Sequence, residues 1–178
     1  KTGTRNLIQK KYHGNILSLI QGASATNNYG HWMLDIVPKL CIAELYKDLS
    51  KFEKVYLPNN ELGFQRDSLR YFNLKNNQII TEKNIRHLFA KKITIIQHPY
   101  WGKNKHQGQT ASIDSDMIKI LRKKFLNFKV SNKSKKIFID RSDSKFYHSQ
   151  IENYDEVIKI LKSLNFKIIK LSNLSFKK

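Results

Sequence analysis

Short apolar runs alternate with longer amphipathic stretches along most of this 178-residue chain, and few folds accommodate such a pattern. Several apolar runs are too short for a helix and are rich in β-branched and aromatic residues, which predicts strands. The predicted strands cover residues 16–20, 54–57, 78–81, 93–97, 136–140 and 166–171. Apolar residues at three- and four-residue steps predict helices over residues 31–49, 63–72, 115–128 and 154–164. Strands that alternate with helices indicate an α/β fold with mainly parallel sheets.

A polar, lysine-rich stretch at residues 129–136 divides this pattern into two parts. After it, residues 136–171 repeat strand, helix and strand, which predicts the βαβ start of a second unit. We place a domain boundary near Val130, with one α/β domain over residues 1–130 and a second unit over residues 131–178. Two strands are too few to complete a sheet, so we expect the second unit to be the beginning of a larger domain.

The chain is strongly basic, with 33 Lys and Arg against 14 Asp and Glu and a formal net charge of +19. Such a balance raises nucleic acid or an anionic membrane as a partner. However, 27 of the basic residues are lysines, only six are arginines, and they are dispersed over nearly every segment. Nucleic-acid modules cluster arginines with stacking aromatic residues. We therefore expect no nucleic-acid partner, while peripheral contact with an anionic membrane stays open.

Cysteine content and hydropathy exclude several further classes of protein. The single cysteine, Cys41, lies in an apolar helical run and rules out an internal disulfide or a cysteine-based metal site. No apolar stretch approaches the roughly 18 residues that span a bilayer, and the first residues lack the hydrophobic segment of a signal peptide. These features predict a cytoplasmic protein, with a peripheral position at the inner face of the membrane as the alternative.

Polar and aromatic residues are densest at residues 27–40, where a predicted strand and a small polar loop lead into a helix. This place at the carboxyl edge of a sheet is the usual ligand site of α/β proteins. If Asn27 or Asn28 caps the helix, His31 and Asp35 share one helix face and could act as a base and its orienting carboxylate. The same pair could instead form a hydrogen bond that only anchors the helix.

The remaining residues of this helix are predicted to serve the fold rather than the site. Met33, Ile36, Val37 and Leu40 form its apolar face and should pack against the sheet. Pro38 lies deep in the pattern and predicts a kink or a carbonyl without its helical donor.

A second cluster follows the predicted strand that ends at Asp140. Arg141 is one of only six arginines, and its planar guanidinium at a loop ahead of a helix suits bidentate binding of phosphate. A salt bridge from Arg141 to Asp140 or Asp143 is the alternative. The aromatic segment at residues 98–102 could stack on a sugar ring or fill the edge of a core, and the core is favoured. One His and one Asp at helical spacing make an incomplete metal set, so no metal site is predicted.

Two blocks of the chain resemble glycosyltransferases of family 61. The family shares Asn-Tyr-aromatic-His-Trp-hydrophobic-hydrophobic-Asp and then Pro-basic-Leu, which residues 28–35 and 38–40 follow closely. It also shares a strand ending in Arg-Ser-Asp and an Asn with acidic residues opening a helix, as at residues 139–143 and 153–157. In two departures, Gly30 replaces an aromatic residue and a second arginine after the first is missing.

The resemblance implies a Rossmann-like GT-B fold, with the acceptor-side domain at residues 1–130 and the start of the nucleotide-sugar-binding domain at residues 131–178. It implies inverting sugar transfer from a nucleotide-sugar donor to a glycan or lipid-linked acceptor, in surface or capsular polysaccharide synthesis, without an obligatory metal or other cofactor. The implied site residues are His31 and Asp35 for catalysis, Arg141, Ser142 and Asn153 at the donor phosphates, and Asn28, Tyr29 and Trp32 in the acceptor-side loop. Because the family's His-Gly-Ala-rich donor loop does not occur in the chain, we expect an incomplete fragment that is inactive alone.

An acyltransferase is the alternative enzyme, since some families that transfer acyl groups from a thioester also use His-x-x-x-Asp. Those families usually place a glycine after the aspartate and often a second histidine before the first. Here Ile36 and Gly30 occupy these positions, which favours the glycosyltransferase. A basic nucleic-acid-binding module is the alternative outside the enzymes, and the dispersed lysines disfavour it.

Overall fold

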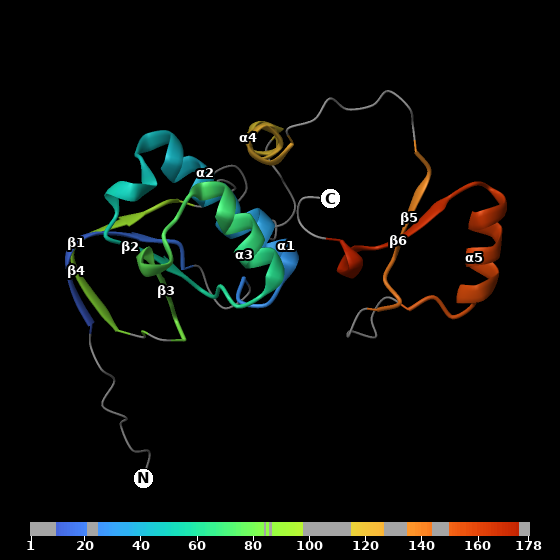
Figure 1. The fold of residues 1–178 in the computed structure, drawn as a ribbon, viewed down its shortest axis with the longest axis horizontal. Coiled ribbons are helices and arrows are strands. Elements are labelled where there is room, and N and C mark those ends of the chain that lie inside the picture. The colour runs from blue at the N-terminus through green and yellow to red at the C-terminus, as the bar shows by residue number, and fades with distance from the viewer. Residues whose placement is uncertain are drawn as a thin grey trace, which may run out of the picture. The chain divides into compact units, whose positions relative to one another are not determined.

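The computed structural model describes residues 10–20, 25–83, 85, 87–97, 115–126, 135–143 and 150–174. The chain forms two compact units, residues 1–127 and residues 128–178, which are considered separately (Figure 1). The assignment of acceptor and donor roles to two domains stays a prediction. The aromatic segment at residues 98–102 lies outside the described residues, so both interpretations of it stay predictions as well.

The first unit is built on a four-stranded sheet in which all neighbouring strands are parallel. Its strands are β1 (Lys10–Ser18), β2 (Lys54–Leu57), β3 (Ile79–Thr81) and β4 (Leu88–Ile95). The order across the sheet is β3-β2-β1-β4, so β1 pairs with both β2 and β4. Parallel neighbours need crossover connections, and helices supply several of them. The predicted α/β class with a Rossmann-like parallel sheet is therefore confirmed.

Two strands of this sheet extend beyond their predicted bounds. β1 begins at Lys10 where residues 16–20 were predicted, and β4 covers Leu88–Ile95 where residues 93–97 were predicted. The first halves of β1 and β4, which were not predicted, pair with each other, with Lys11 opposite Phe89. Most of their side chains are exposed or half-buried. Backbone hydrogen bonding holds these residues in the sheet, so they carry no apolar signal in the sequence.

The helices of the first unit are short and connect or cover the strands. The chain leaves β1 through a loop into α1 (Tyr29–His31), the π-helical turn η1 (Trp32–Ile36) and α2 (Val37–Tyr46). The other helices are α3 (Gly63–Leu69), α4 (Ser115–Phe125) and the 3-10 turns η2 (Leu49–Lys51), η3 (Arg70–Phe72) and η4 (Asn76–Gln78). None of the helices in the described ranges has the length and apolar character that a membrane span requires.

The single helix predicted over residues 31–49 is thus divided by a π-helical turn just ahead of Pro38. In this turn the N–H of Val37 bonds to the carbonyl of Trp32, five residues back. Proline has no N–H to return to the carbonyl of Leu34, four residues back. Pro38 instead lies in the first turn of α2, where a missing donor costs least. The predicted disturbance at Pro38 takes the form of a local change in helix type.

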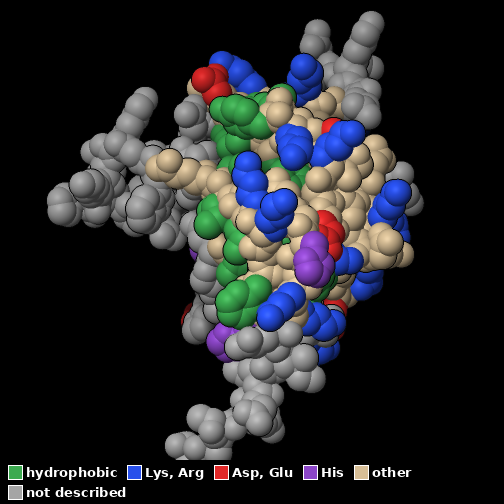
Figure 2. Space-filling view, turned by 90° about the vertical axis from the view of Figure 1, so that its left-hand side faces the viewer, with side chains coloured by type: hydrophobic (Ala, Val, Ile, Leu, Met, Phe, Trp, Pro, Cys, Tyr) green, Lys and Arg blue, Asp and Glu red, His purple; other side chains and the backbone are tan. Residues whose placement is uncertain are grey.

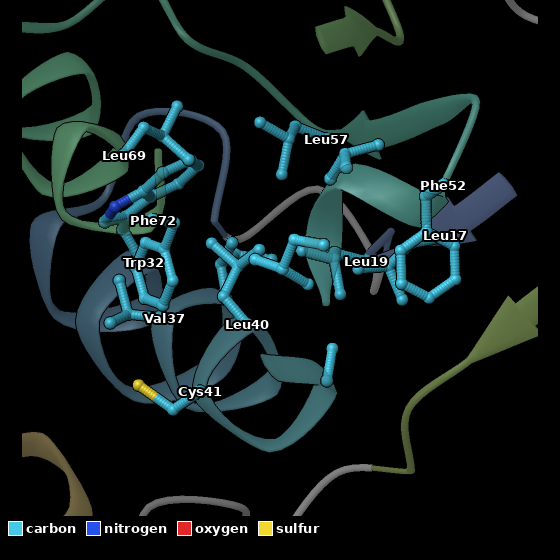
Figure 3. Close-up of a cluster of buried hydrophobic side chains, with 14 of the residues drawn as sticks. Leu17, Leu19, Trp32, Val37, Leu40, Cys41, Phe52, Leu57, Leu69 and Phe72 are labelled. Atoms are coloured by element: carbon cyan, nitrogen blue, oxygen red, sulfur yellow. The ribbon is translucent and has the colours of Figure 1, made fainter. Parts of the chain in front are cut away.

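The core of the first unit lies between one face of the sheet and the helix that follows β1 (Figure 3). The side chains of Ile36, Val37 and Leu40 are fully buried against strand residues, among them Leu17 and Leu57. Complete burial of one such aliphatic side chain contributes about 1.5–3 kcal/mol. The predicted apolar helix face is confirmed, and Met33 packs at its margin, partly buried.

Cys41 belongs to the same core, as its apolar surroundings predict. Burial raises the pKa of its thiol to about 11, so the thiolate needed for metal binding or nucleophilic attack is suppressed. A salt bridge of 2.6 Å from Lys124 Nζ to Glu44 Oε2 ties α4 to α2 beside this core.

The second unit consists of a two-stranded parallel sheet and one helix. Strand β5 (Ile137–Asp140) leads to α5 (Tyr154–Ser163), which returns the chain to β6 (Lys167–Lys170). A 3-10 turn, η6 (Leu171–Asn173), follows β6. The predicted strand, helix and strand are all present. Ile137 and Ile139 are about half exposed along β5, as expected for so small a sheet.

We predict that Ser68→Ala destabilises the first unit through the indole of Trp32. The Trp32 side chain is fully buried and its Nε1 donates to Ser68 Oγ at 2.8 Å. An orphaned buried donor costs about 1–3 kcal/mol, so the free energy of unfolding in urea should fall by that amount. Trp32→Phe removes the donor, and Ser68→Ala should then cost clearly less in the Trp32→Phe background. Equal costs in both backgrounds would show that the hydrogen bond does not stabilise the turn.

Candidate active site

The candidate site of the first unit begins at the loop between β1 and α1, at the carboxyl end of the central strand. Asn28 has extended backbone geometry, and its Oδ1 accepts a hydrogen bond of 3.1 Å from His31 N, which caps the helix as predicted. The loop ahead of Asn28 is held at Thr26. Its carbonyl accepts hydrogen bonds from Gln65 Nε2 and Asn59 Nδ2, at 2.9 and 3.2 Å. Two buried amides therefore fix the loop that starts the site.

Asn59 and Gln65 were not predicted as site residues from the sequence. Their side chains are buried although both are polar, and a buried amide is normally present because it satisfies a backbone group. Asn59 also accepts hydrogen bonds from the backbone N–H groups of Asn60 and Glu61, at 2.9 and 3.3 Å. Neither amide is close to the His-Asp pair in the sequence, so no motif spacing predicts this supporting role, and only the tertiary structure reveals it.

His31 and Asp35 are joined by a hydrogen bond of 2.9 Å between Nδ1 and Oδ2. The His31 side chain is 33% exposed and that of Asp35 only 11%. A carboxylate at Nδ1 selects the tautomer with its proton there, which leaves Nε2 free to accept a proton. Asp35 lies in the π-helical turn, and His31 is the residue directly before it. Such irregular turns within a helix are frequent at functional sites.

Lys39 lies one helical turn after Asp35. In the sequence it is only the basic residue of the Pro-basic-Leu block at residues 38–40. Its side chain is buried, at 4% exposure. Desolvation lowers the pKa of the Lys39 amine, while the carboxylate of Asp35 acts in the opposite direction. The carboxylate of Asp35 is thus hydrogen-bonded to His31 and also acts electrostatically on the buried Lys39. The signal in the sequence was the spacing of four residues between Asp35 and Lys39.

The three predicted residues of the acceptor-side loop divide into an exposed pair and a buried member. Asn28 is exposed, and Tyr29 is half exposed with its ring packed edge-on against Phe64 at 5.2 Å between centroids. The ring of Trp32 packs against the same phenylalanine from the core side, at 6.4 Å. Asn28 and Tyr29 therefore lie beside His31 on accessible surface, whereas the Trp32 indole supports the loop from within.

A hollow of about 620 Å³ lies next to this loop, at the carboxyl ends of β2 and β3. It combines amide, hydroxyl and charged groups. Its lining residues are Thr26, Asn27, Tyr56, Pro58, Asn59, Glu61, Glu82 and Lys83. Polar hollows at the carboxyl edge of a parallel sheet are the usual ligand sites of this architecture.

The predicted cluster of the second unit is organised around the buried carboxylate of Asp140. Its Oδ2 accepts from Tyr154 Oη at 2.6 Å and from Ser142 Oγ at 3.1 Å, and its Oδ1 accepts from Ser142 N at 2.8 Å. The bond from Tyr154, together with those from Ser142, lowers the pKa of Asp140 to about 2. Asp140, charged at neutral pH, therefore holds the first residues after β5 in place through Ser142.

Arg141 is exposed, and the alternative that it forms a salt bridge to Asp140 or Asp143 is wrong. Asp140 is bonded as above and lies 3.6 Å from Lys170 Nζ, while Asp143 accepts from Ser172 Oγ. Within the described residues the guanidinium makes no ion pair. It borders a hollow of about 340 Å³ whose lining residues are Phe138, Ile139, Asp140, Arg141, Ser142, Gln150, Ile151 and Tyr154.

The other two residues predicted at the donor phosphates have partners of their own. Ser142 donates both its backbone N–H and its hydroxyl to Asp140. Asn153 is exposed at the start of α5, where its Nδ2 donates to Glu156 Oε2 at 3.4 Å. Of the three, Arg141 has the most donors without a partner among the residues that the structure describes. The described part of the chain contains no group of three or more His, Cys, Asp or Glu side chains that could hold a metal ion.

The fold and this site together define an α/β protein with a polar site at the carboxyl edge of a parallel sheet. The family model Glycosyltransferase 61 matches residues 29–178, and the chain therefore belongs to glycosyltransferase family 61. No curated protein and no solved structure matched the chain in the corresponding comparisons. Membership of this family implies a sugar donor and an acceptor as substrates.

We predict that Tyr154→Phe raises the pKa of Asp140 towards its ordinary value of about 3.9. The folded pKa of about 2 lies below that of the unfolded chain, so Asp140 stabilises the fold above about pH 4. This stabilisation is lost as the pH falls towards 2. Removing the Tyr154 hydroxyl should shift the start of acid unfolding of the second unit to higher pH. Carboxyl-carbon NMR titration and circular dichroism measure the two effects.

The matched control for this experiment is Tyr46→Phe, because the Tyr46 ring is 85% exposed in the first unit. It should leave both the Asp140 titration and the acid transition unchanged. An unchanged Asp140 pKa in Tyr154→Phe would show that the Ser142 bonds alone hold the carboxylate in its charged form.

Proposed function

We propose that the protein is an inverting glycosyltransferase that uses a nucleotide-sugar donor and has the two-domain GT-B arrangement. The observation that carries this proposal is the 2.9 Å hydrogen bond between His31 and Asp35 at the carboxyl edge of the sheet, in a chain of family 61. A base of this kind is what an inverting transfer requires on the acceptor side. The His-x-x-x-Asp spacing that some acyltransferases share does not outweigh the family match.

In the proposed reaction, Nε2 of His31 accepts the proton of an acceptor hydroxyl as its oxygen attacks the anomeric carbon. The new glycosidic bond forms on the face opposite the leaving nucleoside diphosphate, whose bond to the sugar breaks, so the configuration inverts. Asp35 holds the imidazole through Nδ1 and stabilises the imidazolium that forms. Exposed Asn28 and Tyr29 beside His31 would contact the acceptor, and the buried Trp32 would keep the loop in place.

On the donor side we assign the diphosphate to Arg141, with Ser142 and Asn153 beside it. A guanidinium with unused donors at the end of a strand can bind two phosphate oxygens at once. It would also stabilise the charge that develops on the leaving group, so the proposed reaction needs no obligatory metal and no other cofactor. The anchored loop after β5 supports this role because Asp140 fixes the backbone on both sides of Arg141.

We further propose that the product belongs to a surface or capsular polysaccharide, with a glycan or lipid-linked acceptor used on the cytoplasmic side. A lipid-linked acceptor would bring the protein to the inner face of the membrane.

The proposed catalytic pair of His31 and Asp35 is tested with Asp35→Asn in the protein expressed from its complete reading frame. Donor use is first established with a panel of UDP-, GDP- and dTDP-sugars. The amide keeps the shape of Asp35 but removes its charge, so kcat should fall by about a hundredfold or more with the melting temperature unchanged. Asp67→Asn is the matched control, because Asp67 pairs with Arg70 on the outside of the same unit.

Near-normal turnover in Asp35→Asn would remove Asp35 from the mechanism. A large loss of melting temperature with a proportionate loss of activity would support the anchoring interpretation of the pair.

The donor assignment predicts that Arg141→Lys raises the KM for the nucleotide sugar by about tenfold, since one charge-assisted hydrogen bond of the fork is lost. Arg122→Lys provides the control, as Arg122 is an exposed arginine on α4. Steady-state kinetics with varied donor and saturating acceptor separates KM from kcat. An unchanged donor KM would place the diphosphate elsewhere.

A further inference from the structure

Strand β4 lies at one edge of the described sheet and exposes large apolar side chains. Phe89, Ile93 and Ile95 are 54%, 45% and 73% exposed. Their positions differ by even numbers of residues, so all three side chains project from one side of the strand. Among the strands that the structure describes, β1 is the only neighbour of β4. An apolar row of this kind on a protein surface indicates an interaction site.

Lysines lie within and beside this apolar row. Lys10 and Lys11 on β1 and Lys91 and Lys92 on β4 are all exposed. Lys91 and Lys11, which pairs in register with Phe89, project from the same side as the apolar row, and Lys10 and Lys92 project from the other. Neither strand contains an aspartate or glutamate. The carboxylate of Glu53 reaches β1, where it accepts from Gly14 N at 2.5 Å. Figure 2 shows this side of the first unit, where hydrophobic side chains lie among lysines and arginines.

The combination of aliphatic and cationic groups distinguishes between possible partners. Nucleic acid would be bound by arginines and stacking aromatic rings, whereas these strands have no arginine and two isoleucines in the exposed row. A second copy paired along β4 would bring Lys91 and Lys92 close to the same lysines of the other chain, which is unfavourable. An anionic bilayer offers phosphates to the lysines and hydrocarbon to the isoleucines.

We propose that the face of β4 that carries Phe89, Ile93 and Ile95, with Lys11 and Lys91 on the same face, docks the protein on an anionic lipid bilayer. Phe89, Ile93 and Ile95 enter the boundary between headgroups and acyl chains, and the lysine ammonium groups contact lipid phosphates. The proposal names the surface and the lipid chemistry, and it rests on the exposed side chains of the sheet edge rather than on the transfer reaction. It would hold the first unit, which carries the candidate acceptor-side residues, at the membrane surface.

The charge part of the proposal is tested by co-sedimentation of the full chain with vesicles. Phosphatidylcholine vesicles are compared with vesicles that also contain phosphatidylglycerol. We expect binding only to the anionic vesicles, weakening as salt is raised. Lys11→Glu with Lys91→Glu should lower the partition coefficient by about 25-fold, or about fivefold for each lysine. The control, Lys159→Glu with Lys162→Glu, makes the same change in net charge on exposed lysines of α5 and should lower it no more than about twofold.

The apolar part is tested with Ile95→Ser, which should lower the partition coefficient by about tenfold. Leu45→Ser is a matched control, because Leu45 is 73% exposed, as Ile95 is, but lies on α2. Both substitutions are at exposed positions, and thermal unfolding checks that the fold is intact. Equal losses for Ile95→Ser and Leu45→Ser would overturn the proposal.

Three other results would also overturn it. One is equal binding to neutral and anionic vesicles. Another is a dimer in light scattering that Ile95→Ser dissociates, which would assign the edge to a second copy. The third is binding to a single-stranded oligonucleotide that the Lys11 and Lys91 substitutions abolish while vesicle binding is absent. Because the vesicle assay contains no sugar donor or acceptor, its failure would leave the proposed transfer reaction standing, and the reverse also holds.

Discussion

The complete burial of the Trp32 side chain fixes the segment that carries the candidate site. Its indole lies in the core, with the N–H bonded to a buried serine hydroxyl, so the helix after β1 cannot turn about its axis without breaking that bond (Figure 3). His31, one position earlier, is then directed to a partly exposed side, and Asp35 follows it one turn later. The direction in which the proposed base projects is therefore set by the packing of Trp32 in the core, and Asp35 then holds its imidazole.

The π-helical turn, which contains Asp35, interrupts the regular hydrogen bonding of the helix at the candidate site. Pro38 cannot donate to the carbonyl four residues back, and the wider turn at Trp32–Ile36 precedes it. On the same segment, Asp35 lies between His31 and the buried Lys39. A buried ammonium is costly unless negative charge is close, so the carboxylate serves both the lysine and the histidine. Asp35 thus has both a structural and a chemical role, and Asp35→Asn, measured for turnover and for melting temperature, separates the two.

Sequence patterns predicted those parts of the molecule that bury side chains periodically. Strand β2 and the apolar face of the helix after β1 follow directly from such periodicity. The first half of β1 was missed because backbone pairing holds it and its lysines carry no apolar signal. The division of the long predicted helix depends on hydrogen bonds around Pro38, which periodicity does not report. The salt bridge weighed for Arg141 was wrong because Tyr154, fourteen residues further on, occupies its carboxylate partner.

The two units use the same physical device at the carboxyl end of their first strand. After β1, the buried amides of Asn59 and Gln65 hold the Thr26 carbonyl, and His31 is left accessible. After β5, the buried carboxylate of Asp140 holds the loop, and Arg141 is left without an ion pair among the described residues. In both places a buried polar group that is fully engaged makes an irregular backbone stable. The neighbouring side chain is then free to project into solvent at a fixed position, which is what binding and proton transfer require.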